Sequence, residues 1–147
     1  MRERLKQCRE STLDPRLAEL ASGPLTVVGG AVVLKALLTA TVGSPNKHDL
    51  TGWEAFVNKV HVEDYLDPDV TGNQRLMQGI NYAQAIAERL CAEGRPFTVV
   101  LGRDPESDAV TVRFFERHPG ERPWIKDDLE GYLLNEIIAW DVLPLQA

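Results

Sequence analysis

The sequence predicts an α+β fold: a mostly antiparallel sheet of about four to five strands with one main helix packed on it, plus an N-terminal helical extension. Residues 74–93 repeat apolar side chains at helical spacing, which predicts a long amphipathic helix. Residues 96–102 and 109–117 are predicted to form a strand pair around a polar turn, and residues 135–142 favour a closing strand. One apolar helix stripe can cover one apolar sheet face, so a helix on a sheet is the economical arrangement.

The N-terminal part of the chain begins with a short predicted helix. Asp14 can cap the free backbone N–H groups, Pro15 suits the first helical position, and Gly23 suits the position after the end. We interpret residues 25–42 as a strand, a glycine break and a buried helix. A hairpin is an open alternative for this segment, and a membrane span is a minor one.

The main body opens with a predicted strand and continues into the long helix. Residues 55–62 alternate between two sets of side chains, which is typical of a strand. Thr71 or Asn73 can cap the helix that follows, and Gly94 can stop it. Leu129 to Leu134 is ambiguous and could form one helical turn before the final strand.

Length and composition indicate a single domain over residues 1–147. The chain is 44% hydrophobic and 26% charged, as in an ordinary globular protein. The turn-rich residues 43–49 separate an N-terminal helical and apolar extension, residues 1–47, from an α+β body, residues 48–147.

The charge balance narrows the choice of partner. A net charge of −6 disfavours nucleic acid, because phosphate contacts need clustered Lys and Arg. It permits a basic protein partner, or it reflects solubility alone. Cys8 and Cys91 lie far apart in no paired spacing, and the basic start lacks an apolar run behind it. We therefore expect a cytoplasmic protein that binds no membrane.

Catalytic signatures are missing from the sequence, so we expect no catalytic residue, no metal site and no cofactor. His61 is followed by Glu63 and Asp64, which leaves open a small enzyme that uses His61 with nearby carboxylates. His118 precedes a Pro-Gly pair and is interpreted as a turn residue.

Carboxylates gather with aromatic side chains in two stretches. Residues 49–69 hold six acids and one lysine, and residues 121–141 hold six acids with one arginine and one lysine. Such acids can guide a basic partner while Trp and Tyr anchor it. The competing interpretation is that Trp53 and Trp140 are core residues and the acids only solvate the surface. We predict a partner-binding surface made of Trp124, Asp127, Asp128, Glu130, Tyr132, Glu63 and Asp64.

The segment "FVNKVHVEDYL", a helix, and then "VRFFERHPGERPWIKDDLEGY" with a closing apolar strand resemble a known group. The group is the small acidic immunity proteins of bacterial polymorphic-toxin and contact-dependent inhibition systems. The resemblance spans residues 53–142 and implies a cytosolic α+β domain that binds and neutralises one cognate toxin. It implies no catalytic residue, because such proteins inhibit by binding.

Two other functions stay open beside an inhibitor of a basic protein. One is the small enzyme built on His61, which requires a concave pocket with converging carboxylates. The other is a chaperone or adaptor for a secreted protein, which requires a large exposed apolar patch. The sequence leaves the oligomeric state undetermined.

Overall fold

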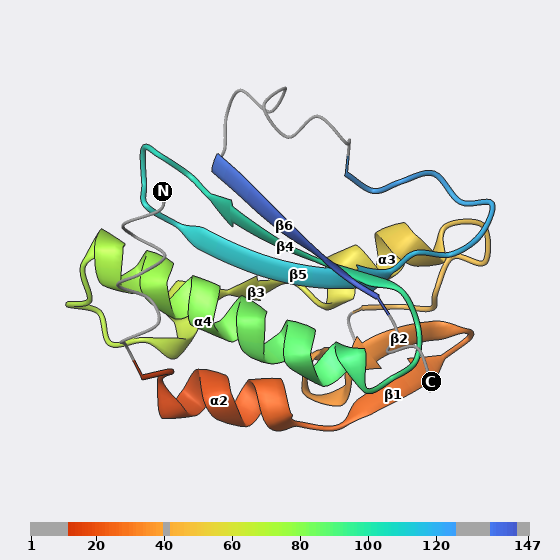
Figure 1. The fold of residues 1–147 in the computed structure, drawn as a ribbon, viewed down its shortest axis with the longest axis horizontal. Helices are drawn as coiled ribbons and strands as arrows, with labels where there is room; N and C mark the ends of the chain where they lie inside the picture. The colour runs from red at the N-terminus through yellow and green to blue at the C-terminus, as the bar shows by residue number, and fades with distance from the viewer. Residues whose placement is uncertain (1–11, 40–41, 126–135, 144–147) are drawn as a thin grey trace.

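A computed structural model describes residues 12–39, 42–125 and 136–143 of the chain (Figure 1). In chain order its elements are α2 (Pro15–Ser22), β1 (Leu25–Val28), β2 (Ala31–Leu34), η1 (Lys35–Leu37), α3 (Leu50–Val57), β3 (Val60–His61), η2 (Val62–Tyr65), α4 (Gly72–Cys91), β4 (Phe97–Arg103), β5 (Val110–Glu116) and β6 (Glu136–Val142).

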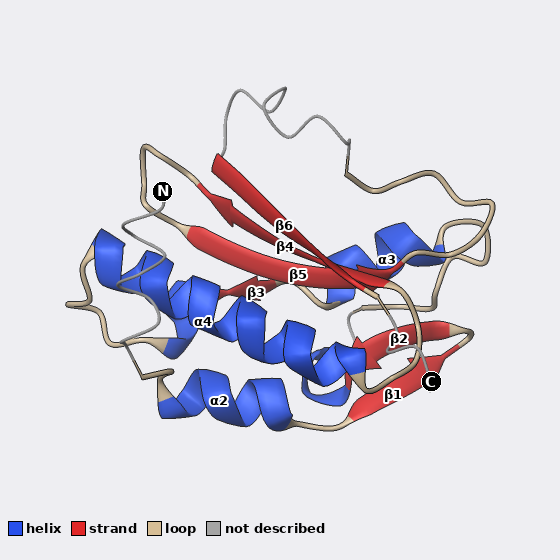
Figure 2. Cartoon of the chain, in the orientation of Figure 1, coloured by secondary structure: helices blue, strands red, loops and turns tan. Residues whose placement is uncertain are grey.

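The strands form two antiparallel sheets, and the fold class is α+β as the sequence predicts (Figure 2). The main sheet has four strands in the order β3-β5-β4-β6, and the smaller sheet is the β1-β2 hairpin. β4 lies in the centre, because Phe97 pairs with Glu116 of β5 on one side and with Val142 of β6 on the other. The expected strands at 96–102, 109–117 and 135–142 are thus confirmed to within a residue or so.

Helix α4 covers one face of the main sheet and supplies the centre of the hydrophobic core (Figure 1). It begins with a capping box, in which the Thr71 side chain and the Gln74 side chain each accept from the other's backbone N–H. Its buried Ile80 and Ile86 join Val99 of β4 in one cluster. The predicted helix is therefore confirmed, with Thr71 as its cap.

The N-terminal helix is also confirmed, and it packs against α4. Asp14 accepts a hydrogen bond from the backbone N–H of Arg16 and Pro15 opens the helix, as predicted. Leu17 and Leu20 of α2, and Leu34 of β2, belong to the same core cluster as α4 and the main sheet. The first part of the chain thus contributes side chains to the common core.

Residues 25–34 form a hairpin and residues 35–37 a short 3-10 turn, so the interpretation as strand, break and helix is wrong and the alternative of a hairpin is confirmed. Gly29 and Gly30 have φ angles of +57° and +90°, and they connect the paired residues Val28 and Ala31. Positive φ at both central positions is the geometry of a tight two-residue hairpin turn. Among the described helices, none is long and apolar enough to cross a membrane.

The expected strand at residues 55–62 overlaps the end of the helix α3, which includes residues 55–57, so this prediction is wrong over most of its length. Only Val60 and His61, the short strand β3, pair with β5. Asp49 starts the helix, because its Oδ1 accepts a hydrogen bond from the N–H of Gly52 at 2.9 Å. A helix cap immediately before residue 50 therefore overrides the local alternation of side chains.

Helix α4 packs closely on the sheet at a glycine, Gly79. A Cβ built on Gly79 would lie 2.6 Å from Cγ1 of Val110 and 3.2 Å from Cδ1 of Leu101. We expect Gly79→Ala to lower the free energy of unfolding by about 1–3 kcal/mol through overpacking, despite the better helix propensity of Ala. Urea denaturation measures this, with Glu88→Ala, exposed on the same helix, as a control that should change stability by less than about 0.5 kcal/mol. A neutral or stabilising Gly79→Ala would contradict the close packing.

Candidate functional site

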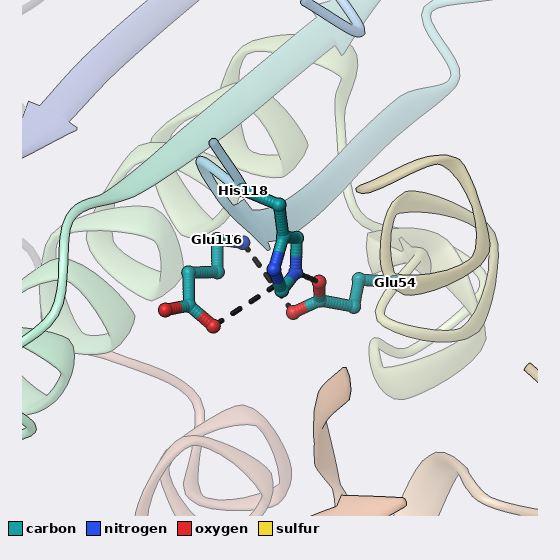
Figure 3. Close-up of side chains that lie close together, drawn as sticks. All are labelled: Glu54, Glu116 and His118. Atoms are coloured by element: carbon teal, nitrogen blue, oxygen red, sulfur yellow. Dashed lines mark hydrogen bonds and ion pairs between the residues drawn. The ribbon is translucent and has the colours of Figure 1, made fainter. Parts of the chain in front are cut away.

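Two carboxylates and one imidazole meet where α3 approaches the end of β5 (Figure 3). They belong to Glu54 of α3, Glu116 at the end of β5, and His118 two residues later. Their donor atoms all lie within 4.8 Å of one another, and this is the single such group among the described residues. Figure 3 shows the His118 ring between the two carboxylates, so we call these three side chains the Glu54 cluster.

Glu54 holds the cluster together because its fully buried carboxylate has three partners. Its Oε2 accepts hydrogen bonds from the N–H of Val32 in β2 at 3.1 Å and from the N–H of Glu116 at 3.4 Å. Its Oε1 is hydrogen-bonded to Nε2 of His118. One side chain thus connects the hairpin, α3, the main sheet and the segment that follows β5.

Asn58, one helical turn after Glu54, extends this connection to the hairpin. Its Nδ2 donates to the carbonyls of Val32 at 3.0 Å and Phe114 at 3.3 Å, and its Oδ1 accepts from the N–H of Leu34 at 3.0 Å. Among the described strands, β2 pairs only with β1, so Glu54 and Asn58 satisfy backbone groups on its other edge. Buried polar side chains on α3 are therefore a structural requirement of this junction.

Burial raises the pKa of Glu54 from 4.5 to about 7, although its bonds to His118 and to two backbone N–H groups act in the opposite direction. Desolvation penalises the charged carboxylate, and it outweighs the favourable contacts. Glu54 therefore ionises near neutral pH instead of near pH 4.5.

We expect the free energy of unfolding to fall as the pH rises from about 4.5 towards 7 because of Glu54. In this window the folded protein holds a proton that the unfolded chain has released, so the stabilisation is complete below pH 4.5 and is lost through pH 7. The contribution is at most about 3 kcal/mol. Urea denaturation at about pH 5 and pH 8 measures this change. The free energy of unfolding should depend less on pH in Glu54→Gln than in the unmodified chain, and equal dependences would disprove that Glu54 is the responsible group.

Glu121 attaches the segment after β5 to the beginning of α3. Its two carboxylate oxygens accept hydrogen bonds from the N–H groups of Leu50 at 3.0 Å and Thr51 at 2.8 Å. Burial acts to raise the pKa of Glu121, but the hydrogen bonds from Thr51 and Leu50 and the charge of His118 outweigh it, so the pKa is lowered. The carboxylate is therefore ionised at the positive end of the helix.

A pocket of about 380 Å³ opens beside the Glu54 cluster, on the sheet face opposite α4. Phe115 and Ala139 supply apolar lining from β5 and β6, while His118, Arg122 and Trp124 line it from the segment that follows β5. The volume lies within the range of small-molecule sites, and it also suits one large side chain of a partner. The charges of the lining are mixed, since it also includes a further arginine, a glutamate and an aspartate: Arg117, Glu121 and Asp141.

Trp124 stands at this pocket with 39% of its surface exposed. Its ring lies 5.6 Å from that of Phe115, and the guanidinium carbon of Arg113 lies 4.5 Å from the centre of the indole. Arg113 is itself held by a hydrogen bond to the carbonyl of Ala55 at 3.3 Å. The partly exposed indole is therefore held in position by contacts within the chain.

The structure separates the described parts of the predicted surface. Trp124 lies at the pocket, against Arg113 and Phe115. Glu63 instead accepts a hydrogen bond from the N–H of Val110, at the start of β5, and Asp64, the next residue in η2, is exposed. The other predicted residues lie outside the described residues: Asp127, Asp128, Glu130 and Tyr132.

The histidine that meets carboxylates is His118, which the sequence suggested was only a turn residue. His61 is exposed on β3 and does not line the pocket. Glu116 and His118 are two residues apart, a spacing that places side chains on the same side of an extended chain. That spacing was visible in the sequence, but Glu54 lies 64 positions from His118 and no local pattern links them.

Comparisons with known proteins place the chain in a family. A family model described as "Uncharacterized protein PM0498 family" matches residues 1–144. Searches of curated proteins and of solved structures found no match. Because the family model covers nearly the whole sequence, the chain belongs to the uncharacterized PM0498 family.

Proposed function

We propose that this chain is a binding protein that sequesters and neutralises a basic partner protein, in the manner of an immunity-type toxin inhibitor. The observation that carries the proposal is the pre-positioned indole of Trp124 at the edge of a pocket of about 380 Å³. Trp and Arg beside a pocket are the side chains that most often dominate protein–protein binding energy. An indole that is already fixed loses little conformational freedom when the partner binds.

The pocket suits a side chain of the partner as its occupant. Apolar lining from Phe115 and Ala139 can receive an aliphatic or aromatic group, while Glu121 and Asp141 provide negative charge for a basic neighbour. The preference for a basic partner also rests on the net charge of −6. Arg117 and Arg122 add positive charge to the same lining. They disfavour partners whose charges do not match this pattern, and so contribute to specificity.

Capture from cells that naturally produce the chain tests this function. The full chain, carrying an affinity tag, should retain one basic protein in a one-to-one ratio. Trp124→Ala should lose it, whereas Phe56→Ala should keep it, because Phe56 is 65% exposed on α3 and does not line the pocket. Expression of the captured protein alone should arrest growth, and co-expression with the chain should restore it. A captured protein without such toxicity would contradict neutralisation and favour a chaperone or adaptor.

A further inference from the structure

We propose that Glu54, Glu116 and His118 form a binding site for a divalent transition-metal ion, with Zn²⁺ as the best-suited ion. This site adjoins the pocket proposed to bind a partner protein, because His118 lines that pocket, but the metal proposal does not depend on that function. One imidazole nitrogen and two carboxylate oxygens form a donor set that Zn²⁺ uses in proteins, with a fourth position left for water. Glu54 lies 62 positions from Glu116 and 64 positions from His118, so no local motif of the sequence shows the whole set.

The positions of the donor atoms fit a small ion. Nε2 of His118 lies 3.8 Å from Oε2 of Glu116 and is in direct contact with Oε1 of Glu54. Metal–ligand bonds of about 2.0–2.2 Å place neighbouring ligand atoms roughly 3.3–3.5 Å apart in a tetrahedral site. Small rotations of the side chains therefore suffice to admit an ion between the imidazole and the two carboxylates (Figure 3).

The fold holds the central carboxylate in an orientation that suits a ligand. Oε2 of Glu54 is fixed by the N–H groups of Val32 and Glu116, which leaves Oε1 directed at the imidazole. Hydrogen bonds of this kind, made to the far oxygen of a ligating carboxylate, orient metal ligands in known sites. Arg95 lies 3.4 Å from Oε2 of Glu116, but its side chain is 45% exposed and can turn towards solvent when an ion binds.

The charges of the cluster also favour a cation. Glu54 is completely buried, and the side chains of His118 and Glu116 are only 12% and 14% exposed. A dication would compensate two carboxylates in a place where water screens them poorly.

The pocket supplies access to the cluster. His118 belongs both to the cluster and to the lining of the pocket of about 380 Å³. An ion can therefore arrive from solvent on the side of the imidazole, and a water molecule in the pocket can complete its coordination. Of the three proposed ligands, His118 is the one that lines the pocket.

Titration of the metal-free full chain with ZnCl₂ tests the site by calorimetry, and CoCl₂ absorption reports direct ligation. We expect one Zn²⁺ per chain, visible absorption of the Co²⁺ complex, and no comparable binding of MgCl₂. His118→Ala and Glu116→Gln should each weaken binding at least about tenfold, whereas His61→Ala, which removes an exposed histidine, should leave it unchanged.

Three results would overturn the metal site. They are no Zn²⁺ binding at micromolar concentration, a Co²⁺ complex without visible absorption, and equal affinity in the His118→Ala variant. Circular dichroism shows whether each variant is folded, and Glu116→Gln preserves the shape of its side chain if His118→Ala does not fold. None of these measurements involves Trp124, so they are independent of the capture experiment.

Discussion

Glu54→Ala should lower the free energy of unfolding at neutral pH by about 3 kcal/mol or more. The substitution removes the acceptor of the Val32 and Glu116 N–H groups and the partner of the His118 ring at once. Each buried donor left without an acceptor costs about 1–3 kcal/mol. Urea denaturation measures the effect as a lower midpoint with an unchanged slope.

Two further variants separate the role of Glu54 from the general loss of a carboxylate. Glu19→Ala removes an exposed carboxylate from α2 and should change stability by less than about 0.5 kcal/mol. Glu54→Gln keeps one acceptor oxygen, so its decrease in the free energy of unfolding should lie between the decreases of Glu54→Ala and Glu19→Ala. A Glu54→Ala protein within about 1 kcal/mol of the unmodified chain would show that the cluster does not hold the hairpin, α3 and the main sheet together.

Trp124→Ala should weaken the complex with the captured partner by about 2–4 kcal/mol, which is roughly 30- to 1,000-fold in Kd. The loss combines the buried indole surface with its contacts to Phe115 and Arg113. Calorimetry or surface plasmon resonance measures the affinity. The effect should appear mainly as faster dissociation, because affinity differences among variants of one interface lie mostly in the dissociation rate.

The matched control for Trp124 is Phe56→Ala, which also deletes an exposed aromatic side chain. It should change Kd by less than about threefold, since most residues outside the central contacts contribute little. Higher salt should slow association of the unmodified chain with a basic partner and leave dissociation nearly unchanged. A larger effect of Phe56→Ala than of Trp124→Ala would place the interface on α3 instead.

Local signals in the sequence predict those parts of the fold that form from neighbouring residues. The helix α4 carries its apolar stripe and its Thr71 cap within one segment, and β4 and β5 are joined by a short polar turn. Helix α3 was missed because part of its stabilisation comes from far away in the chain. Its first N–H groups are satisfied by Glu121, about 70 positions later, and its buried polar side chains face the β1-β2 hairpin.

The candidate site was only partly predictable for the same reason. Trp124 was singled out as an anchor, and the structure places it at the pocket. The Glu54 cluster was not anticipated, because it exists only when α3 is laid beside the end of β5. Glu63 and Asp64 were grouped with Trp124 because both stretches are acidic and aromatic. Composition carries no information about position, and Glu63 in fact lies at the start of β5, away from Trp124.

Hydrogen–deuterium exchange of the chain, free and in complex with its captured partner, tests the central claim most directly. The claim is that the pocket at Trp124 is the docking surface. We expect slower exchange in the complex over residues 113–125 and 136–142, with residues 62–70 unchanged. Protection confined to residues 62–70 or to α2, with the pocket segments exchanging as in the free chain, would contradict the account.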